Sequence, residues 1–230
     1  MNTISYFQDI PNLKSGTAYN IISRESEKII DLYRKSWSKQ GWNPIVLNEE
    51  YAQENKLYKD LGFSNRNANF YKNKSQHSFG YMRACYLRLL AYCEYVRRNG
   101  ATLYSDYDVM NYGLRPSIID EIEPNSSLCD QRSVVYLGLK GVEEMEDALR
   151  KYSRNSSVYY EHDMQLMKNE TKSFKNLVDK NGEYIYCYPY RACAKRDAST
   201  PLIHYNGACY SRGISINLTR SEIIINHGRI

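Results

Sequence analysis

The sequence predicts an α/β fold in which a mostly parallel central sheet is flanked by helices. Residues 1–50 carry the pattern strand, helix, strand, which begins a parallel sheet with right-handed crossovers. Further along, a long helical pattern at 79–98 runs directly into a short apolar strand pattern at 101–105. The chain has 230 residues and no internal repeat, which fits a single domain over residues 1–230.

Apolar spacing and turn residues locate the individual elements. Apolar side chains in 23–39 recur at near-helical spacing, and Gly41 ends this helix. Those in 79–98 do the same, before the helix ends at Asn99 and Gly100. The other expected elements are a strand at 3–7, a strand at 44–47, a helix at 49–61, a polar loop at 62–76, one or two strands at 128–139, a helix at 142–152 and an aromatic strand at 184–190.

Two acids, Asp106 and Asp108, follow directly after the apolar strand pattern at 101–105. Residues i and i+2 of an extended chain project to the same side, so the two carboxylates converge on one point at the end of the strand. Their mutual repulsion is relieved by a cation, and Mg²⁺ or Mn²⁺ prefers carboxylate oxygen. A D-x-D pair also arises by chance in roughly every second chain of this length. The position after a buried strand is therefore what favours a metal site.

Composition excludes several classes of function. The net charge of +5 comes from scattered Lys and Arg, apart from Arg97 and Arg98, which argues against a dedicated nucleic-acid surface. No apolar stretch reaches about 18 residues, so no membrane-spanning helix is expected. The N-terminus lacks the layout of a signal peptide, which favours a cytoplasmic location. The six cysteines form no C-x-x-C pair, so zinc is disfavoured and reduced thiols are expected.

Four spaced motifs between about residues 81 and 207 resemble those of metal-dependent GT-A glycosyltransferases. The D-x-D follows a strand, and the helix segment YLRLL, which contains Arg88, resembles the Y-x-R helix of the glycogenin-like and lipooligosaccharide galactosyltransferase families. The segment DMQLM, from Asp163, is similar to their D-Q-x-L-L-N segment. The segment HYNG, from His204 to Gly207, is similar to the first half of their H-x-x-G-x-x-K-P-W motif. The chain is also similar in size to GT-A domains encoded by large DNA viruses.

This resemblance implies a transfer of sugar from a nucleotide sugar, by default a UDP-sugar, to a glycan acceptor. It implies that Asp106, Asp108 and His204 bind Mn²⁺ (or Mg²⁺), which stabilises the charge on the departing diphosphate. Asp163 is implied as the catalytic residue, across the sugar from the diphosphate. The donor-binding residues expected from the resemblance and from the strand ends are Tyr6, Phe7, Gln8, Arg83, Arg88, Ser105, Asp106, Tyr107, Asn206, Gly207 and Arg212.

The sequence departs from the family pattern at two places. Tyr210 stands where the family has Lys, no Pro-Trp follows, and Arg212 is a candidate to take over the phosphate contact. Gln165 is displaced by one position from the family's Asp-Gln pair. Together with Gln165, Asp163 suggests retention of the anomeric configuration. As part of the segment EHD it could instead be a general base for inversion, and both outcomes stay open.

Other functions and other roles compete with this interpretation. A metal-dependent phosphoesterase or nucleotidyltransferase usually holds two metals and needs more carboxylates. A non-catalytic carbohydrate-binding module could use the aromatic run at 184–190. Asp163 could be a helix N-cap, His204 a structural histidine, and Arg83 or Arg88 a structurally paired side chain.

Overall fold

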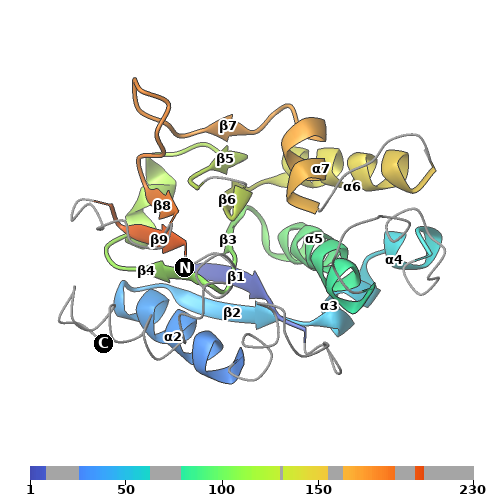
Figure 1. Cartoon of the computed structure of the whole chain (residues 1–230), viewed down its shortest axis with the longest axis horizontal. Coiled ribbons are helices and arrows are strands. Elements are labelled where there is room, and N and C mark those ends of the chain that lie inside the picture. The colour runs from blue at the N-terminus through green and yellow to red at the C-terminus, as the bar shows by residue number, and fades with distance from the viewer. Residues whose placement is uncertain (9–25, 63–78, 130–131, 155–162, 190–199, 205–230) are drawn as a thin grey trace.

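A six-stranded mixed sheet forms the centre of the computed structural model, which describes residues 1–8, 26–62, 79–129, 132–154, 163–189 and 200–204 (Figure 1). The strand order is β2-β1-β3-β6-β5-β7. Parallel pairs join β1 to β2, β1 to β3 and β5 to β7, whereas β6 runs antiparallel to both β3 and β5. The strands are β1 (Asn2–Tyr6), β2 (Asn43–Leu47), β3 (Thr102–Ser105), β5 (Ser126–Ser127), β6 (Val134–Leu137) and β7 (Lys175–Asn176). The predicted α/β fold with a mostly parallel sheet is therefore confirmed, and β3 is an inner strand as expected.

A second, three-stranded sheet was not predicted from the sequence. It has the order β4-β9-β8 and contains β4 (Val109–Asn111), β8 (Cys187–Pro189) and β9 (Leu202–His204). Strand β4 follows β3 after a short turn, and it pairs antiparallel with β9, which comes from the far end of the described chain. The aromatic run at 184–190 contributes β8, which pairs parallel with β9. This small sheet brings residue 204 beside residue 109.

Helices cover both faces of the large sheet (Figure 1). They are α2 (Ser26–Lys39), α3 (Glu49–Glu54), α4 (Leu57–Asp60), α5 (Phe79–Asn99), α6 (Leu139–Arg154) and α7 (Asp163–Glu170), with a 3₁₀ turn at Pro116–Asp120. The single helix expected at 49–61 is two helices, because Asn55 adopts an extended backbone between them. Its side chain accepts a hydrogen bond from the Leu57 amide (2.9 Å) and donates one to Glu146 (3.1 Å). The loop expected at 62–76 lies, apart from Gly62, outside the described residues.

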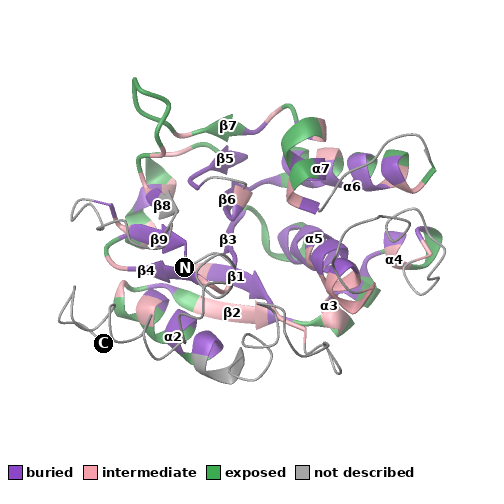
Figure 2. Ribbon diagram, viewed as in Figure 1, coloured by how far each residue is buried: buried purple, intermediate pink, exposed green. Residues whose placement is uncertain are grey.

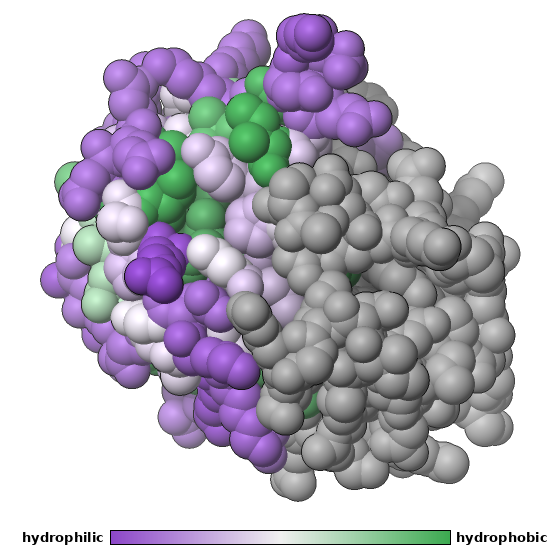
Figure 3. All heavy atoms as spheres, turned by 90° about the vertical axis from the view of Figure 1, so that its left-hand side faces the viewer, coloured by the Kyte–Doolittle hydropathy of each residue, from purple (hydrophilic) through white to green (hydrophobic). Residues whose placement is uncertain are grey.

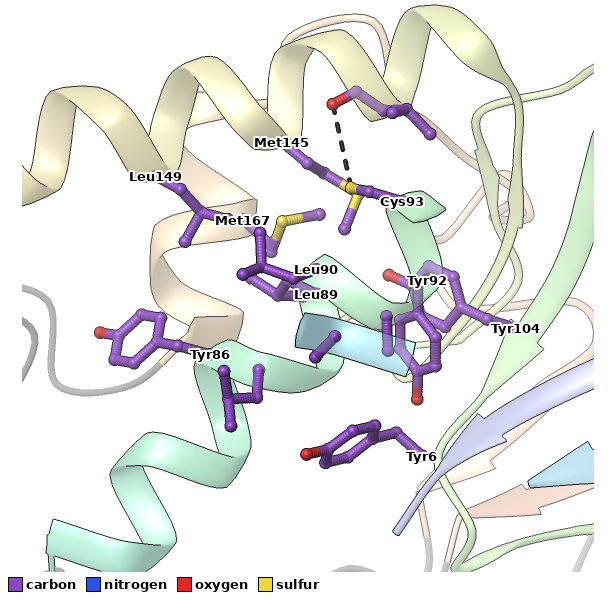
Figure 4. Packing of buried hydrophobic residues seen from close by; sticks show 14 of the residues in the cluster. Tyr6, Tyr86, Leu89, Leu90, Tyr92, Cys93, Tyr104, Met145, Leu149 and Met167 are labelled. Carbon is purple, nitrogen blue, oxygen red and sulfur yellow. Dashed lines mark hydrogen bonds between the residues drawn. The ribbon is translucent and has the colours of Figure 1, made fainter. Parts of the chain in front are cut away.

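The alternation of side chains along the inner strands builds a separate core on each face. On β3, Leu103 belongs to the cluster under α2, whereas Tyr104 belongs to the cluster under α5, α6 and α7. Both side chains are at most 2% exposed, as a central strand requires. Tyr104 stacks on Tyr92 of α5 with ring centroids 4.4 Å apart (Figure 4). The inner strands are accordingly buried while β2 is partly exposed (Figure 2).

Two of the cysteines correct the expectation of reduced thiols. Cys129, directly after β5, forms a disulfide with Cys187 on β8. Cys85 and Cys93 of α5 are free and buried, as expected. No local pattern predicts this pairing, because 58 positions separate the two residues. The disulfide joins the large sheet to the small one.

The end of the molecule that carries the small sheet presents mostly hydrophilic side chains around a few hydrophobic ones, where residues are described (Figure 3). Val178 and Ile185 are the large hydrophobic residues exposed in the described segment before β8. None of the helices in the described ranges combines the length and the apolar character needed to cross a lipid bilayer.

Candidate metal centre

Asp106, Asp108 and His204 come together at the junction of the two sheets. The Asp106 amide donates to the Ser133 carbonyl (2.8 Å), and its own carbonyl accepts from the Val109 amide (3.0 Å), so the chain turns at 106–109 and enters β4. In the pairing of β4 with β9, Val109 lies opposite His204. One possible ligand atom from each of Asp106, Asp108 and His204 lies within 4.8 Å of the others. These three residues could therefore hold one metal ion.

The chemistry of Asp108 fits a bound cation. Its Oδ1 atom is buried and has no hydrogen-bond partner among the described residues. The Nε2 atom of His204 lies 3.4 Å from it, close enough for an ionic contact when the imidazole is protonated. A buried carboxylate oxygen without a partner is costly, and a cation would remove that cost. Two carboxylates with one imidazole suit Mn²⁺ better than Ca²⁺, which prefers oxygen alone.

Arg88 of α5 connects this group to Asp163, the first residue of α7. Its Nη1 atom donates to Asp106 Oδ1 at 2.7 Å, and its Nε atom donates to Asp163 Oδ2 at 2.6 Å. The Asp106 and Asp163 side chains are 7% and 2% exposed, so both ion pairs lie in a largely dry environment. A guanidinium that binds two carboxylates fixes both of them relative to the helix that carries it. Arg88 thus links Asp163 to Asp106 of the metal group.

Burial and neighbouring charges shift the pKa values of these groups. Burial raises the pKa of Asp106 to about 6, although Arg88 opposes the shift. Burial alone would lower the pKa of His204, but the neighbouring Asp108 outweighs it and raises that pKa above its usual range. For Arg88, burial is likewise outweighed by Asp106 and Asp163, so its pKa rises and the guanidinium stays charged. Protons therefore compete with a metal at Asp106 and at His204 near neutral pH.

The strand ends place two aromatic side chains near the acids. Phe7, which follows β1, and Tyr107 in the turn meet edge to face with ring centroids 5.7 Å apart, and both are half-buried. Tyr6 points the other way, into the core, where it is 4% exposed and donates to Gln8 Oε1 at 2.9 Å. Ser105 is fully buried and donates to the Tyr33 hydroxyl at 3.4 Å. Of the expected donor-binding residues, Phe7 and Tyr107 are thus the partly exposed aromatic ones.

Arg83, the other arginine expected at the donor site, belongs to a separate polar network. It forms a two-pronged ion pair with Glu49 and donates to the Tyr58 hydroxyl at 2.8 Å. Gln8 donates to the same Glu49 carboxylate at 2.7 Å, and Tyr6 donates to Gln8. The structure therefore brings Arg88, and not Arg83, to the carboxylates of the metal group.

Three of the expected residues lie outside the described part of the chain, and a buried tyrosine near Asp106 was not predicted. Asn206, Gly207 and Arg212 lie outside the described residues. Gln165 is exposed on α7, whereas Asp163 is buried. Tyr92 was not predicted: its hydroxyl is buried without a hydrogen-bond partner in the described part of the chain, and burial together with the nearby Asp106 raises its pKa. Its position four residues after Arg88 on the same helix face was the available signal.

No protein-family model matches the chain, and no curated protein or solved structure matches it significantly. The function must therefore be inferred from the metal centre and its surroundings.

Proposed function

We propose that this chain is a Mn²⁺-dependent glycosyltransferase of the GT-A type, which transfers a sugar from a nucleotide sugar to a hydroxyl group of a glycan. UDP-sugars are the default donors. The observation that carries this proposal is the convergence of Asp106, Asp108 and His204 at the carboxyl end of β3, with Asp163 held next to them by Arg88. Ligands of open α/β sheets bind at that end of the strands.

The chemistry of the proposed reaction needs positive charge at one side and a carboxylate at the other. Breaking the bond between the sugar and the diphosphate places negative charge on the diphosphate, which a bound Mn²⁺ stabilises as a Lewis acid. Asp106, Asp108 and His204 would hold that ion. Asp163 would face the sugar, oriented by its hydrogen bond from Arg88 Nε. Phe7 and Tyr107 are partly exposed at the strand ends, where they could pack against a nucleotide base.

A phosphoesterase or nucleotidyltransferase is less well supported. Such enzymes generally use two metal ions about 3.5–4 Å apart, bound by several bridging carboxylates. In the described residues, one group of three possible ligands is found, and Asp163 is not part of it. This arrangement suits a single ion.

Calorimetry of UDP binding with and without Mn²⁺ tests the proposal. A site with three protein ligands holds a metal weakly until phosphate oxygens complete its coordination. Mn²⁺ should therefore increase the affinity for UDP, and UDP should increase the affinity for Mn²⁺ by the same factor. Asp108→Asn keeps the shape but removes a charge, and should abolish this coupling and the release of UDP from UDP-sugars. Asp120→Asn, at an exposed acid in the 3₁₀ turn that is not part of the metal group, is the matched control and should change neither. If Mn²⁺ leaves the UDP affinity of the wild type unchanged, the proposed metal dependence is wrong.

A further inference from the structure

The metal ligand His204 lies on a strand of three residues, apart from the sheet that orients Asp106. Strand β9 is held on one side by β4, where His204 lies opposite Val109, and on the other side by β8. Short strands of this kind have few backbone hydrogen bonds and gain their order from what surrounds them. The position of His204 relative to the acids therefore depends on how firmly β8 and β9 are attached to the large sheet.

The disulfide provides that attachment at a specific point. On the small sheet, Cys187 is the register partner of Leu202, two residues before His204. On the large sheet, Cys129 follows β5, and its carbonyl accepts from the Ser127 hydroxyl at 3.1 Å. The preceding Leu128 amide donates to Val134 of β6 at 2.9 Å. A covalent link therefore runs from the segment that follows β5, which is hydrogen-bonded to β6, to β8, the strand that adjoins β9.

This link is independent of the turn that carries the acids. Along the chain, the large sheet reaches the small one through 106–109, which contains Asp106 and Asp108, and reaches it again through 177–186, which leads from β7 to β8. The disulfide adds a cross-link between Cys129 and Cys187, whose side chains are at most 1% exposed. A cross-link between two sheets that the chain already joins elsewhere removes freedom of movement that those connections leave.

We propose that the Cys129–Cys187 disulfide is a positioning element of the metal centre, which holds His204 at bonding distance from the ion bound by Asp106 and Asp108. The proposal rests on the metal centre of the proposed function. A dithiol would undo the effect: its two sulfurs become a disulfide, while two electrons and two protons pass to Cys129 and Cys187 as the bond between them breaks. Metal affinity would then fall although the three ligands are still present.

Titration of Mn²⁺ alone, followed by the electron paramagnetic resonance of the free ion, measures the effect directly. Cys129→Ala/Cys187→Ala should bind Mn²⁺ about 10-fold more weakly, within the range of about 10–100-fold seen when the support of a ligand is lost. His204→Ala should also bind more weakly. Adding His204→Ala to the double cysteine variant should then lower the affinity for Mn²⁺ only a little further, because the disulfide acts through His204. Wild-type affinity in the double variant, or losses that add in full, would overturn the proposal.

Amide hydrogen exchange provides a readout that needs no metal. In Cys129→Ala/Cys187→Ala, residues 202–204 should exchange faster while residues 102–105 stay protected. Cys85→Ala/Cys93→Ala is the control, because it removes two cysteine side chains that form no disulfide and leaves the Cys129–Cys187 bond intact. Unchanged protection of 202–204 would refute the positioning role, whatever the substrate proves to be. If Mn²⁺ binds but does not tighten UDP binding, the glycosyltransferase proposal fails while the role of the disulfide stands.

Discussion

Replacement of Arg88 by Met tests whether the guanidinium holds the two acids of the site in place. Met keeps much of the aliphatic length of the side chain but leaves Asp106 and Asp163 without their cation. Because both carboxylates are buried, they cannot recover the lost interaction from water. Breaking a buried ion pair by removing one partner costs about 3–5 kcal/mol, so Arg88→Met should lower the melting temperature by roughly 6–20 °C for a chain of this size.

The pH dependence of this loss separates an electrostatic role from simple packing. In the wild type Arg88 lowers the pKa of Asp106, against the larger effect of burial. Without Arg88 the pKa of folded Asp106 should rise further above that of the unfolded chain. A raised folded-state pKa means that stability is retained at low pH and is lost as the pH rises through that pKa. Arg88→Met should therefore be nearly as stable as the wild type at about pH 4 and much less stable at about pH 8.

Arg83→Met is the matched control, because it removes an arginine from the same helix. Arg83 pairs with Glu49, whose side chain is 27% exposed and can be rehydrated, so the loss should be about 1.5–3 kcal/mol. Arg83 lowers the pKa of Glu49 by more than burial raises it, so the stability that this ion pair provides is present above about pH 4.5 and is lost as the pH falls below it. The stability lost in Arg83→Met should therefore be nearly constant above about pH 4.5 and smaller at lower pH. Mn²⁺ should raise the melting temperature of Arg88→Met by more than that of Arg83→Met, since the ion supplies charge to Asp106. Equal losses, an equal pH dependence and no difference in the response to Mn²⁺ would refute the role assigned to Arg88.

Three further predictions follow from the site and from the core. The affinity for Mn²⁺ should rise from about pH 5 to about pH 8, because Asp106, with its pKa raised to about 6, and His204, with its raised pKa, must both lose protons; a flat profile in the resonance titration would contradict it. Phe7→Leu should weaken UDP binding in the presence of Mn²⁺ by about 1–3 kcal/mol, while Tyr6→Phe, which keeps a buried ring, should not; calorimetry of both variants decides. Gly141→Ala should lower the free energy of unfolding in urea by about 1–3 kcal/mol, because the added Cβ would lie 2.2 Å from Oδ1 of Asn125, which accepts a hydrogen bond from the Gly141 amide. An unchanged midpoint of urea unfolding would show that Asn125 moves away freely.

Local pattern was enough to predict four strands of the large sheet, β1, β2, β3 and β6, but not β5 and β7. The periodicity of 79–98 and the apolar run before Asp106 are properties of adjacent residues, and both elements occur where expected. The same local reasoning placed two carboxylates at the end of a strand. His204 was expected only through the resemblance, because no rule about neighbouring residues connects positions 106 and 204.

What the sequence did not reveal depends on contacts between distant segments. The small sheet consists of strands of three residues, too short for a period to be recognised. The choice between Arg83 and Arg88 was open because it is decided by Glu49, which lies 34 positions before Arg83 and takes it as a partner. Asn55 ends a helix because Glu146, in another helix, accepts a hydrogen bond from its side chain.

The balance of charge at the junction of the two sheets is a physical reason to expect a divalent ion. Asp106, Asp108 and Asp163 bring three negative charges together, and Arg88 pairs with Asp106 and Asp163. Among the described residues, two negative charges therefore remain uncompensated when His204 is neutral. Folded proteins do not keep such an excess in a dry site without a partner, and the raised pKa values of Asp106 and His204 reflect that cost. Protonation of these groups relieves the excess at low pH, and a divalent cation would relieve it at neutral pH. A diphosphate would add negative charge to this region, so the carboxylates would repel it in the absence of a cation. With the ion bound between the carboxylates and the phosphates, both sets of negative charge are attracted to the same positive charge, and the diphosphate should bind more tightly. The coupling of Mn²⁺ and UDP expected from calorimetry is thus a consequence of the charge that the fold has already placed there.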